Sequence, residues 1–172
     1  MRGIKLIKKI KKSISRFLIN HIFLGTRYFG IKSVLLRFSG YKIGKNTKIV
    51  GPINYGNAIK FNIGDNCWIG KNISFDGNGI VNIENNVDIG PNCVINTGGH
   101  EIGTSNHRAG KGLSNTITIK NGVWIGTNCI IINNSTIENG SVVGAGAVVI
   151  GDVSCNTLVA GVPAKIKKKY DF

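Results

Sequence analysis

Branched apolar side chains recur at every sixth residue over most of this 172-residue chain. The longest series runs through Ile119, Ile125, Ile131, Ile137, Val143, Val149 and Cys155. The same phase appears earlier in two shorter series, Ile63, Ile69 and Phe75, and then Ile83, Ile89 and Ile95. A slip of two residues separates Phe75 from Ile83, and Ile43 and Ile49 look like an irregular start. Neither an amphipathic helix nor a simple hairpin has this period, so the pattern predicts a short strand and a turn, repeated many times.

Residues that tolerate a positive φ angle stand three places after the apolar ones. They are Gly122, Asn128, Asn134, Gly140, Gly146 and Asp152 in the long series, and Asn66, Asn72, Asn78, Asn86, Asn92 and Gly98 in the earlier ones. Coils of this kind stack through main-chain hydrogen bonds about 4.8 Å apart, with each apolar side chain above its equivalent. A β-sandwich is the competing fold, but it favours period-two alternation and loops of variable length. The sequence therefore predicts an all-β coil.

The repeat stops over residues 97–116 and then resumes with its phase unchanged. Ile95 and Ile119 are 24 residues apart, which equals four hexapeptides. The coil can therefore leave its path here as one extruded loop, and loops on rigid scaffolds commonly carry functional residues. His100 lies at the root of this loop, whereas His107 lies in its middle, in a stretch typical of a solvated loop.

Positive charge is concentrated at the N-terminal end of the chain, whose formal net charge is +14. Residues 1–64 carry fourteen Lys or Arg and no acidic residue, whereas residues 65–172 carry eight residues of each sign. At about 100° per residue, one face of the first segment is apolar. It consists of Ile4, Leu6, Ile7, Ile10, Ile14, Phe17 and Leu18. We expect a basic amphipathic helical extension over residues 1–40.

Three roles compete for this extension. It could lie on an anionic inner membrane leaflet through residues 1–24, or cap the open end of the coil, especially through residues 22–40. It could also bind nucleic acid, but no recognition motif stands beside the helix, so this role is the weakest. We favour the membrane, although such a helix could equally aid subunit assembly. The sequence contains no run of about eighteen apolar residues, so we expect no transmembrane helix.

The four cysteines follow no zinc-ligand spacing. Cys67, Cys93, Cys129 and Cys155 all fall on positions that the repeat assigns to the core, so we expect buried free thiols and no metal site. No P-loop or dinucleotide fingerprint appears between a strand and a helix, because the glycines of residues 144–148 belong to the coil.

The individual repeats read IGDNCWIG, IENNVDIGPN, IKNGVWIGTN and VVGAGAVVIGDV, and they close with VAGVPAKIKKKY. These segments resemble the hexapeptide-repeat acyltransferases over residues 43–169. Within that family the order VDIGPNCVINTGGHE followed by TITIKNGVWIG is similar to galactoside, maltose and streptogramin acetyltransferases and to polysaccharide O-acetyltransferases. The resemblance implies a left-handed parallel β-helix with three hexapeptides in each coil, over residues 41–169, followed by a tail of residues 170–172.

The resemblance also implies roles for residues at the interruption. His100 occupies the position of the family's catalytic histidine, after a glycine, and an imidazole can take the proton of an attacking hydroxyl. Asp76, Asn78 and Glu101 are candidates for holding the acceptor, and each also fits a plain turn or surface role. His107 could contact the substrate or a neighbouring subunit.

By resemblance the acyl donor is acetyl-CoA, bound without a metal in a groove between two subunits of a homotrimer. Small residues would let the pantetheine arm approach the backbone, Trp124 would line the cleft, and two lysines would meet the phosphates as point charges. The corresponding residues are Gly126, Thr127, Gly144, Ala145, Lys165 and Lys168.

These inferences together predict a cytoplasmic, acetyl-CoA-dependent O-acetyltransferase that modifies a sugar hydroxyl by direct transfer, in surface polysaccharide biosynthesis. A peripheral position on the inner face of the membrane would suit a lipid-linked acceptor. The alternatives are an N-acetyltransferase on an amino sugar or sugar nucleotide, an antibiotic acetyltransferase, and a non-catalytic β-helix scaffold.

Overall fold

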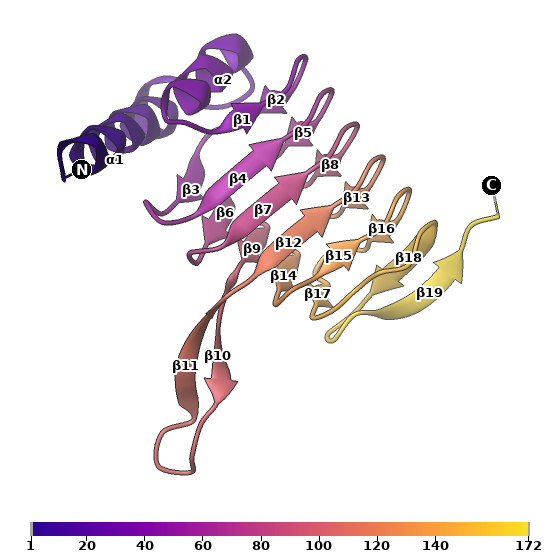
Figure 1. The fold of residues 1–172 in the computed structure, drawn as a ribbon. Helices are drawn as coiled ribbons and strands as arrows, with labels where there is room; N and C mark the ends of the chain where they lie inside the picture. Colours follow the sequence, from indigo (N-terminus) through magenta and orange to yellow (C-terminus); the bar gives the residue numbers. More distant parts are fainter. Residues whose placement is uncertain (1, 172) are drawn as a thin grey trace.

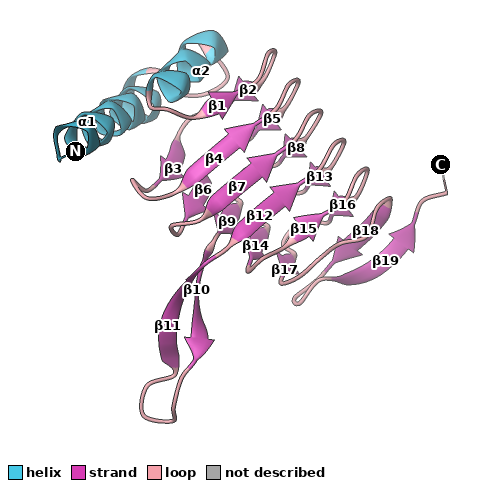
Figure 2. Ribbon diagram, in the orientation of Figure 1, coloured by secondary structure: helices cyan, strands magenta, loops and turns pink. Residues whose placement is uncertain are grey.

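A computed structural model describes residues 2–171 and shows a stack of short parallel strands with helices at one end (Figures 1 and 2). The helices come first in the chain: α1 (Arg2–Phe17), the π-helical turn η1 (Leu18–Ile22) and α2 (Phe29–Phe38). Three strands per coil then wind around one core, so that every third strand falls in the same sheet. The parallel β-helix that the six-residue period predicts is confirmed.

Three sheets form the walls of the coil. The first sheet contains β1 (Lys42–Ile43), β4 (Lys60–Ile63), β7 (Ile80–Ile83), β12 (Thr116–Ile119) and β15 (Thr136–Ile137). The second contains β2 (Lys48–Ile49), β5 (Trp68–Ile69), β8 (Asp88–Ile89), β13 (Trp124–Ile125), β16 (Val142–Val143), β18 (Thr157–Ala160) and the antiparallel β19 (Lys165–Lys169). The third contains β3 (Ile53–Tyr55), β6 (Ile73–Asp76), β9 (Val94–Asn96), β14 (Ile130–Ile132) and β17 (Val148–Val149).

The repeated apolar residues form the core of the coil. In the second sheet the register stacks Ile49, Ile69, Ile89, Ile125, Val143 and Val159, all of which are buried. Equivalent columns run through the other two sheets, so each inward side chain packs on its counterpart in the next coil. This packing explains the recurrence of apolar residues, because a shift by one residue would turn an apolar side chain toward the solvent.

The first coils are longer than eighteen residues. Ile43 pairs with Ile63, and Ile63 pairs with Ile83, so each of these coils spans twenty residues. The slip after Phe75 therefore has an equivalent after Tyr55, and the start that looked irregular is a complete coil. From β12 to β15 the coil shortens to eighteen residues, since Thr118 pairs with Thr136.

The last coil departs from the predicted phase. Val153, sixteen residues after Ile137, forms the bridge to it and is buried. Cys155 is consequently exposed, and its assignment to the core was wrong, whereas Cys67, Cys93 and Cys129 are buried as expected. The cause is a turn of only three residues between Val149 and Val153, which moves the inward position two residues earlier.

Most of the predicted turn residues have the expected backbone. Positive φ angles occur at Asn66, Asn72, Asn86, Asn92, Gly122, Asn128, Gly140 and Gly146. The prediction was wrong for Asn78, Gly98, Asn134 and Asp152, all of which lie where the third sheet meets the first. At that corner the coil length varies, and Gly77 or Asn133 takes the left-handed conformation instead.

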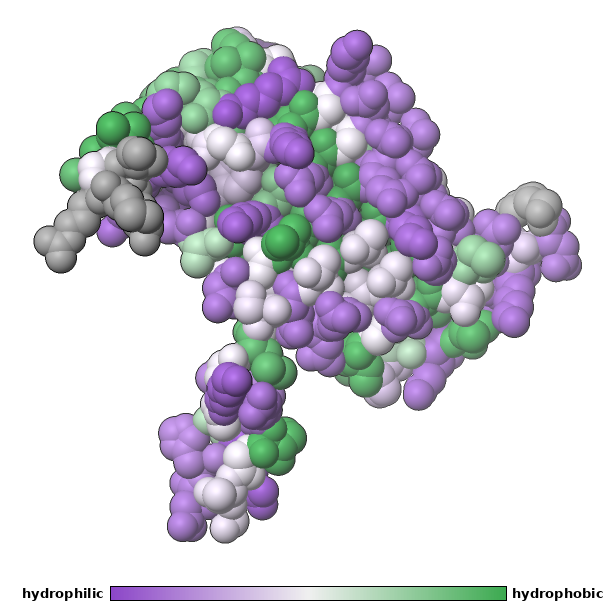
Figure 3. Space-filling view, viewed as in Figure 1, coloured by the Kyte–Doolittle hydropathy of each residue, from purple (hydrophilic) through white to green (hydrophobic). Residues whose placement is uncertain are grey.

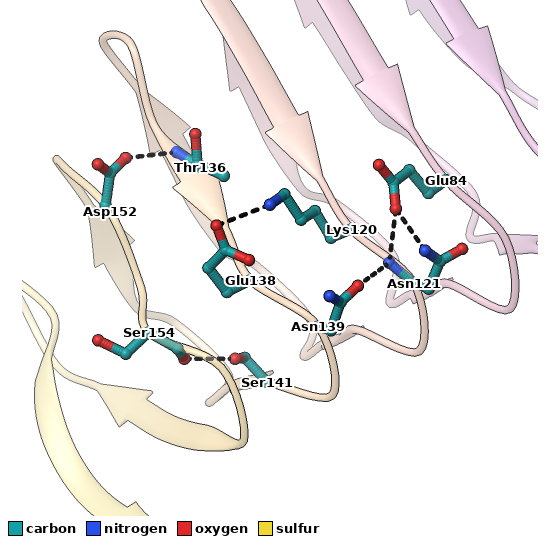
Figure 4. A network of polar contacts seen from close by, with 9 residues as sticks. All are labelled: Glu84, Lys120, Asn121, Thr136, Glu138, Asn139, Ser141, Asp152 and Ser154. Atoms are coloured by element: carbon teal, nitrogen blue, oxygen red, sulfur yellow. Dashed lines mark hydrogen bonds and ion pairs between the residues drawn. The ribbon is translucent and has the colours of Figure 1, made fainter.

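Side-chain ladders join the coils at the corner between the first and second sheets (Figure 4). The backbone N–H of Asn121 donates to Glu84 Oε2 at 3.2 Å and to Asn139 Oδ1 at 3.1 Å, which ties three successive coils together. An ion pair of 2.8 Å between Lys120 Nζ and Glu138 Oε1 links two of the same coils. These contacts satisfy turn groups that the strand ladders leave unpaired.

The helices cap the open end of the coil through polar side chains. Arg16 Nη1 donates to the carbonyl of Tyr55 at 2.6 Å, and Lys12 Nζ donates to that of Asn57 at 2.8 Å. Asn20 exchanges two hydrogen bonds with the backbone of Ile53, of 2.8 and 2.9 Å. From α2, Arg37 donates to the carbonyls of Ile43 and Gly44, both at 2.9 Å. The cap predicted for residues 22–40 is thus present, and α1 shares this role.

Candidate active site

A two-stranded hairpin leaves the coil where the third sheet meets the first (Figure 1). Its strands, β10 (Gly98–Ile102) and β11 (Ala109–Ser114), pair antiparallel, with His100 opposite Gly112. At the tip, Gly103 N donates to the carbonyl of Arg108 at 3.0 Å and His107 N to that of Thr104 at 3.1 Å. The predicted extruded loop therefore exists, but it is a β-hairpin rather than an irregular solvated loop, and exposed His107 lies at its tip.

His100 is held by a backbone carbonyl across the hairpin. Its Nδ1 atom lies 2.9 Å from the carbonyl oxygen of Gly110, and the imidazole is exposed. A carbonyl oxygen can only accept a hydrogen bond, so a neutral imidazole in this position carries its proton on Nδ1. Nε2 then has a free lone pair directed away from this contact, which is the arrangement that a general base requires.

Glu101 does not orient His100. Neighbouring side chains on a strand point to opposite faces, and over residues 2–171 no hydrogen bond or ion pair joins the two. The orienting group is instead the main chain of Gly110, which no side-chain pattern in the sequence could have identified.

Thr97 fastens the root of the hairpin to the coil, and sequence reasoning missed it. Its fully buried hydroxyl donates to the carbonyl of Asp76 and accepts from the N–H of Gly79, each at 3.0 Å. Its main chain donates to the same carbonyl at 3.0 Å and accepts from Asn115 N at 2.8 Å. Through its side chain and main chain together, this one residue joins the strand before the turn, the turn itself and both ends of the excursion.

Replacing Thr97 with valine is expected to destabilise the protein by about 1–3 kcal/mol, because the shape is kept while the Gly79 N–H loses its acceptor. It should also lower any activity that depends on the hairpin. Urea unfolding and an acetyl-transfer assay measure the two effects.

Thr47→Val is the matched control for this variant. The Thr47 hydroxyl also bridges two turn groups, donating to Gly64 O at 2.6 Å and accepting from Cys67 N at 3.1 Å, but at a different corner, between the first and second sheets. The control should lose similar stability and keep its activity. Equal activity in the two variants would contradict a positioning role for Thr97.

Asp76 lies beside the hairpin root. It pairs in register with Asn96, and its carboxylate accepts from Ser74 Oγ at 2.8 Å. Gly77 follows, and its Cα packs directly on the backbone of Gly98, from which His100 is about 7 Å further along the strand. Asn78 lies in the same turn and is exposed. The structure therefore brings Asp76 and Asn78 to the hairpin that carries His100.

The predicted cofactor residues fall in two neighbouring columns along the coil axis. Trp124 stands in register with Val142, Leu158 and Lys168 across β13, β16, β18 and β19. The second column begins at Gly126, two residues after Trp124. There Gly126 packs on Ala145, Gly144 packs on Ala160, and Ala160 pairs with Lys165. Trp124 is 59% exposed, and about 14 Å of sheet separates its row from that of Lys168. An extended ligand such as the pantetheine arm fits this length.

The columns also need their glycines for stacking. A Cβ atom on Gly126 would lie 2.6 Å from Ala145 N, and one on Gly144 would lie 2.9 Å from Ala160 Cβ. Thr127 turns its hydroxyl inward, to the carbonyl of Pro91 at 3.0 Å. Coil packing therefore explains in part why small residues occupy these positions, whereas the exposed side chain of Trp124 has no packing role of this kind.

In one chain the hairpin and these columns do not meet. The columns lie on the second sheet and at the corner that follows it, whereas the hairpin leaves from the next corner. The third sheet stands between them, with about six residues or ~20 Å of extended chain in each coil. His100 and Trp124 therefore belong to different edges of the triangular cross-section.

The buried cysteines are unsuited to nucleophilic catalysis. Cys67, Cys93 and Cys129 are at most 2% exposed, so a substrate cannot reach their thiols. Burial raises the pKa of the Cys67 thiol, whereas the hydrogen bond between Cys93 and Cys129 raises the pKa of Cys93 and lowers that of Cys129. Exposed Cys155 follows β17, two coils beyond the hairpin, between the first and second sheets. In the described part of the chain, no cluster of three or more His, Cys, Asp or Glu residues could hold a metal ion.

Comparisons with known proteins agree with this architecture. The chain is 33% identical over 129 residues to the galactoside O-acetyltransferase of Escherichia coli K12, an alignment that covers 75% of this chain and 64% of that protein. It is 27% identical over 135 residues to a putative colanic acid biosynthesis acetyltransferase of the same organism, with 78% and 72% covered. No family model matches the chain.

Among solved structures, a hexapeptide-repeat-containing acetyltransferase of Vibrio cholerae, complexed with acetyl-CoA, superposes with a TM-score of 0.83. It is 28% identical, and the match covers 99% of this chain and 90% of that one. The chain spans 58–64% of the length of three curated relatives, the galactoside enzyme among them. The chain thus has the fold of the hexapeptide-repeat acetyltransferases and is similar in sequence to acetyltransferases of sugars and polysaccharides.

Proposed function

We propose that the protein transfers an acetyl group from acetyl-CoA to a hydroxyl of a sugar. One observation carries the proposal: the Gly110 carbonyl accepts from Nδ1 of His100 at 2.9 Å and so leaves Nε2 as an exposed base. The names of the relatives support the substrate class, because one acetylates galactosides and another is assigned to colanic acid biosynthesis.

His100 acts as the general base in this proposal. Nε2 takes the proton of the acceptor hydroxyl as its oxygen attacks the thioester carbonyl, and the proton then passes to the departing sulfur. The transfer is direct in this proposal, because three of the thiols are buried and the exposed Cys155 lies two coils away from the hairpin. Asp76, Asn78 and Glu101 are the polar groups available near the hairpin to hold the sugar.

Acetyl-CoA supplies the activated acetyl group when it is bound. Trp124 would line its path, the small residues Gly126, Thr127, Gly144 and Ala145 would leave room for the pantetheine arm, and Lys165 and Lys168 would meet its phosphates. The V. cholerae protein of the same fold has been solved with acetyl-CoA, which supports this ligand.

A homotrimer with its active sites between subunits completes the proposal. The supporting observation is that His100 and Trp124 lie at different edges of one chain, with the third sheet between them. Three copies around an axis parallel to the coil would bring the hairpin of one subunit to the columns of the next. The proposal includes a cytoplasmic location, where acetyl-CoA is available, with peripheral contact to the inner membrane face for a lipid-linked acceptor.

The test is transfer of radiolabelled acetyl groups from acetyl-CoA to free sugars, sugar nucleotides, amino sugars and lipid-linked glycans. We expect one sugar class to be labelled, in a linkage that mild alkali removes, because esters hydrolyse under conditions that leave amides intact. An alkali-stable product would indicate an N-acetyltransferase. Absence of both turnover and acetyl-CoA binding would leave a non-catalytic scaffold.

A further inference from the structure

The outer side of the N-terminal helices is an exposed apolar surface. Because the polar side of α1 is used to cap the coil, its apolar side faces away from the protein. We call this the cap surface, and its members are between 42% and 60% exposed: Leu6, Ile7, Ile10, Ile14 and Phe17 on α1, and Ile31, Val34 and Phe38 on α2. Hydrophobic residues over both helices are visible in Figure 3. The side chains of Arg2, Ile4 and Lys5 lie outside the described part.

The two helices present this surface together. Ser15 Oγ on α1 donates to the carbonyl of Leu35 on α2 at 2.9 Å. Lys11 Nζ lies 4.6 Å from the centre of the Phe38 ring, so a cation stands directly beside the apolar residues. Contiguous apolar patches of this kind are rare on monomeric proteins unless they contact another surface.

A basic cavity borders the cap surface. It has a volume of about 800 Å³ and lies between α1 and the first coils, with Lys8, Lys9, Lys11, Lys12 and Lys60 in its lining. Phe38 of the cap surface also lines it, as does Tyr41, whose buried hydroxyl has no hydrogen-bond partner among the described residues. Burial and the charges of Lys60, Lys8 and Arg16 lower the pKa of Lys12. The cavity is therefore suited to a ligand that carries an anionic group next to an apolar part.

We propose that the cap surface docks on an anionic lipid membrane, with its apolar side chains among the acyl chains and the lysines of the cavity at the lipid phosphates. Apolar residues flanked by Lys are the features of helices that lie in a membrane interface. A second copy of the chain fits less well, because residues 1–64 carry fourteen positive charges and no negative one, so two such surfaces would repel each other. In residues 2–171 no helix is long and apolar enough to cross a membrane.

Docking would define the height of the candidate active site above the lipid. The hairpin leaves between the third and fourth coils, so about 14 Å of stacked coils and ~10 Å of helix separate it from the cap surface. A short glycan on a lipid carrier can span this distance. This last step rests on the proposed function, whereas the docking itself does not.

Flotation of the full-length protein with vesicles tests the proposal. We expect binding to vesicles of phosphatidylcholine mixed with phosphatidylglycerol and little binding to phosphatidylcholine alone. The double variant Ile10→Ser/Ile14→Ser should weaken binding by about tenfold or more, since each substitution removes buried apolar area. Ile150→Ser, at a residue that is 52% exposed on the coil, is the matched control and should bind like the wild type.

Charge variants separate the two parts of the surface. Lys8→Gln/Lys9→Gln should weaken binding to the anionic vesicles by about fivefold for each lysine, whereas Lys45→Gln/Lys71→Gln, on the coil, should change it little. Binding of the wild type that is indifferent to anionic lipid, or unchanged in Ile10→Ser/Ile14→Ser, would overturn the proposal. So would preferential binding to RNA, or self-association in solution that the isoleucine variant abolishes.

Acetyl transfer by Ile10→Ser/Ile14→Ser to a water-soluble acceptor should equal that of the wild type. This assay distinguishes failure of docking from failure of the proposed catalysis, because the cap surface contains no residue of the candidate active site.

Discussion

Replacing His100 with alanine is expected to lower the rate of acetyl transfer by about two to four orders of magnitude, the usual contribution of a general base. The acceptor hydroxyl would have to lose its proton to water instead of to Nε2, which the contact between Nδ1 and the Gly110 carbonyl leaves free in the wild type. Binding of acetyl-CoA should be retained, because the substitution alters none of the predicted cofactor residues on the coil. Steady-state kinetics and isothermal titration with acetyl-CoA measure the two quantities.

Two further variants make this prediction specific. His100→Asn can still donate a hydrogen bond to the Gly110 carbonyl but cannot take a proton, so it should be as slow as His100→Ala. His107→Ala removes an exposed imidazole at the tip of the same hairpin and should keep at least about a third of the rate, well above the loss expected for a missing base. If His100→Ala kept most of its activity while His107→Ala lost it, the assignment of the base to His100 would be wrong and His107 would take that role.

The six-residue period was enough to predict the coil, because a strand and a corner repeat only if the same residue points inward each time. It could not predict where coils lengthen or shorten. Eight residues rather than six separate Tyr55 from Ile63, and Val153 replaces Cys155 in the last coil. Both exceptions lie near the corner between the third and first sheets, where turns of different length lead into equivalent strands.

The orientation of α1 was also beyond the reach of a helical wheel. A wheel shows two faces but not which one packs on the protein, and the usual expectation is that the apolar face does. Here the end of the coil presents unpaired carbonyl and N–H groups at Ile53, Tyr55 and Asn57, which require polar partners. Lys12, Arg16 and Asn20 supply them, and the apolar face is left outside.

For the candidate site, sequence patterns located side chains but not their supports. His100 and Trp124 were found through motifs, whereas the Gly110 carbonyl and the buried Thr97 hydroxyl have no sequence signature. Their importance depends on which turns the hairpin brings together, and that is a property of the folded chain rather than of any local sequence pattern.

Mixing two inactive variants is expected to restore about a quarter of the active sites if each site is shared by neighbouring subunits of a trimer. The first variant is His100→Ala, and the second is Trp124→Ala/Lys165→Glu/Lys168→Glu, in which only exposed side chains of the cofactor columns change. In a randomly mixed trimer, half of the hairpins keep the histidine and half of the neighbouring columns keep their cofactor residues. The product of these fractions is the expected recovery, and each variant alone should remain inactive.

Coexpression with two affinity tags isolates the mixed assemblies, and sedimentation gives their subunit number. His100→Ala mixed with His100→Asn is the control, because no pairing of those chains contains an intact base. Selection for both tags removes the two kinds of uniform trimer, so the isolated mixed trimers should recover about one site in three, against a quarter in the unselected mixture. Recovery at this level requires that His100 of one chain serve the columns of another, which the separation of the two edges by the third sheet predicts. Mixed trimers without activity would mean that both halves come from one chain, so that the hairpin must fold back across the third sheet to reach Trp124.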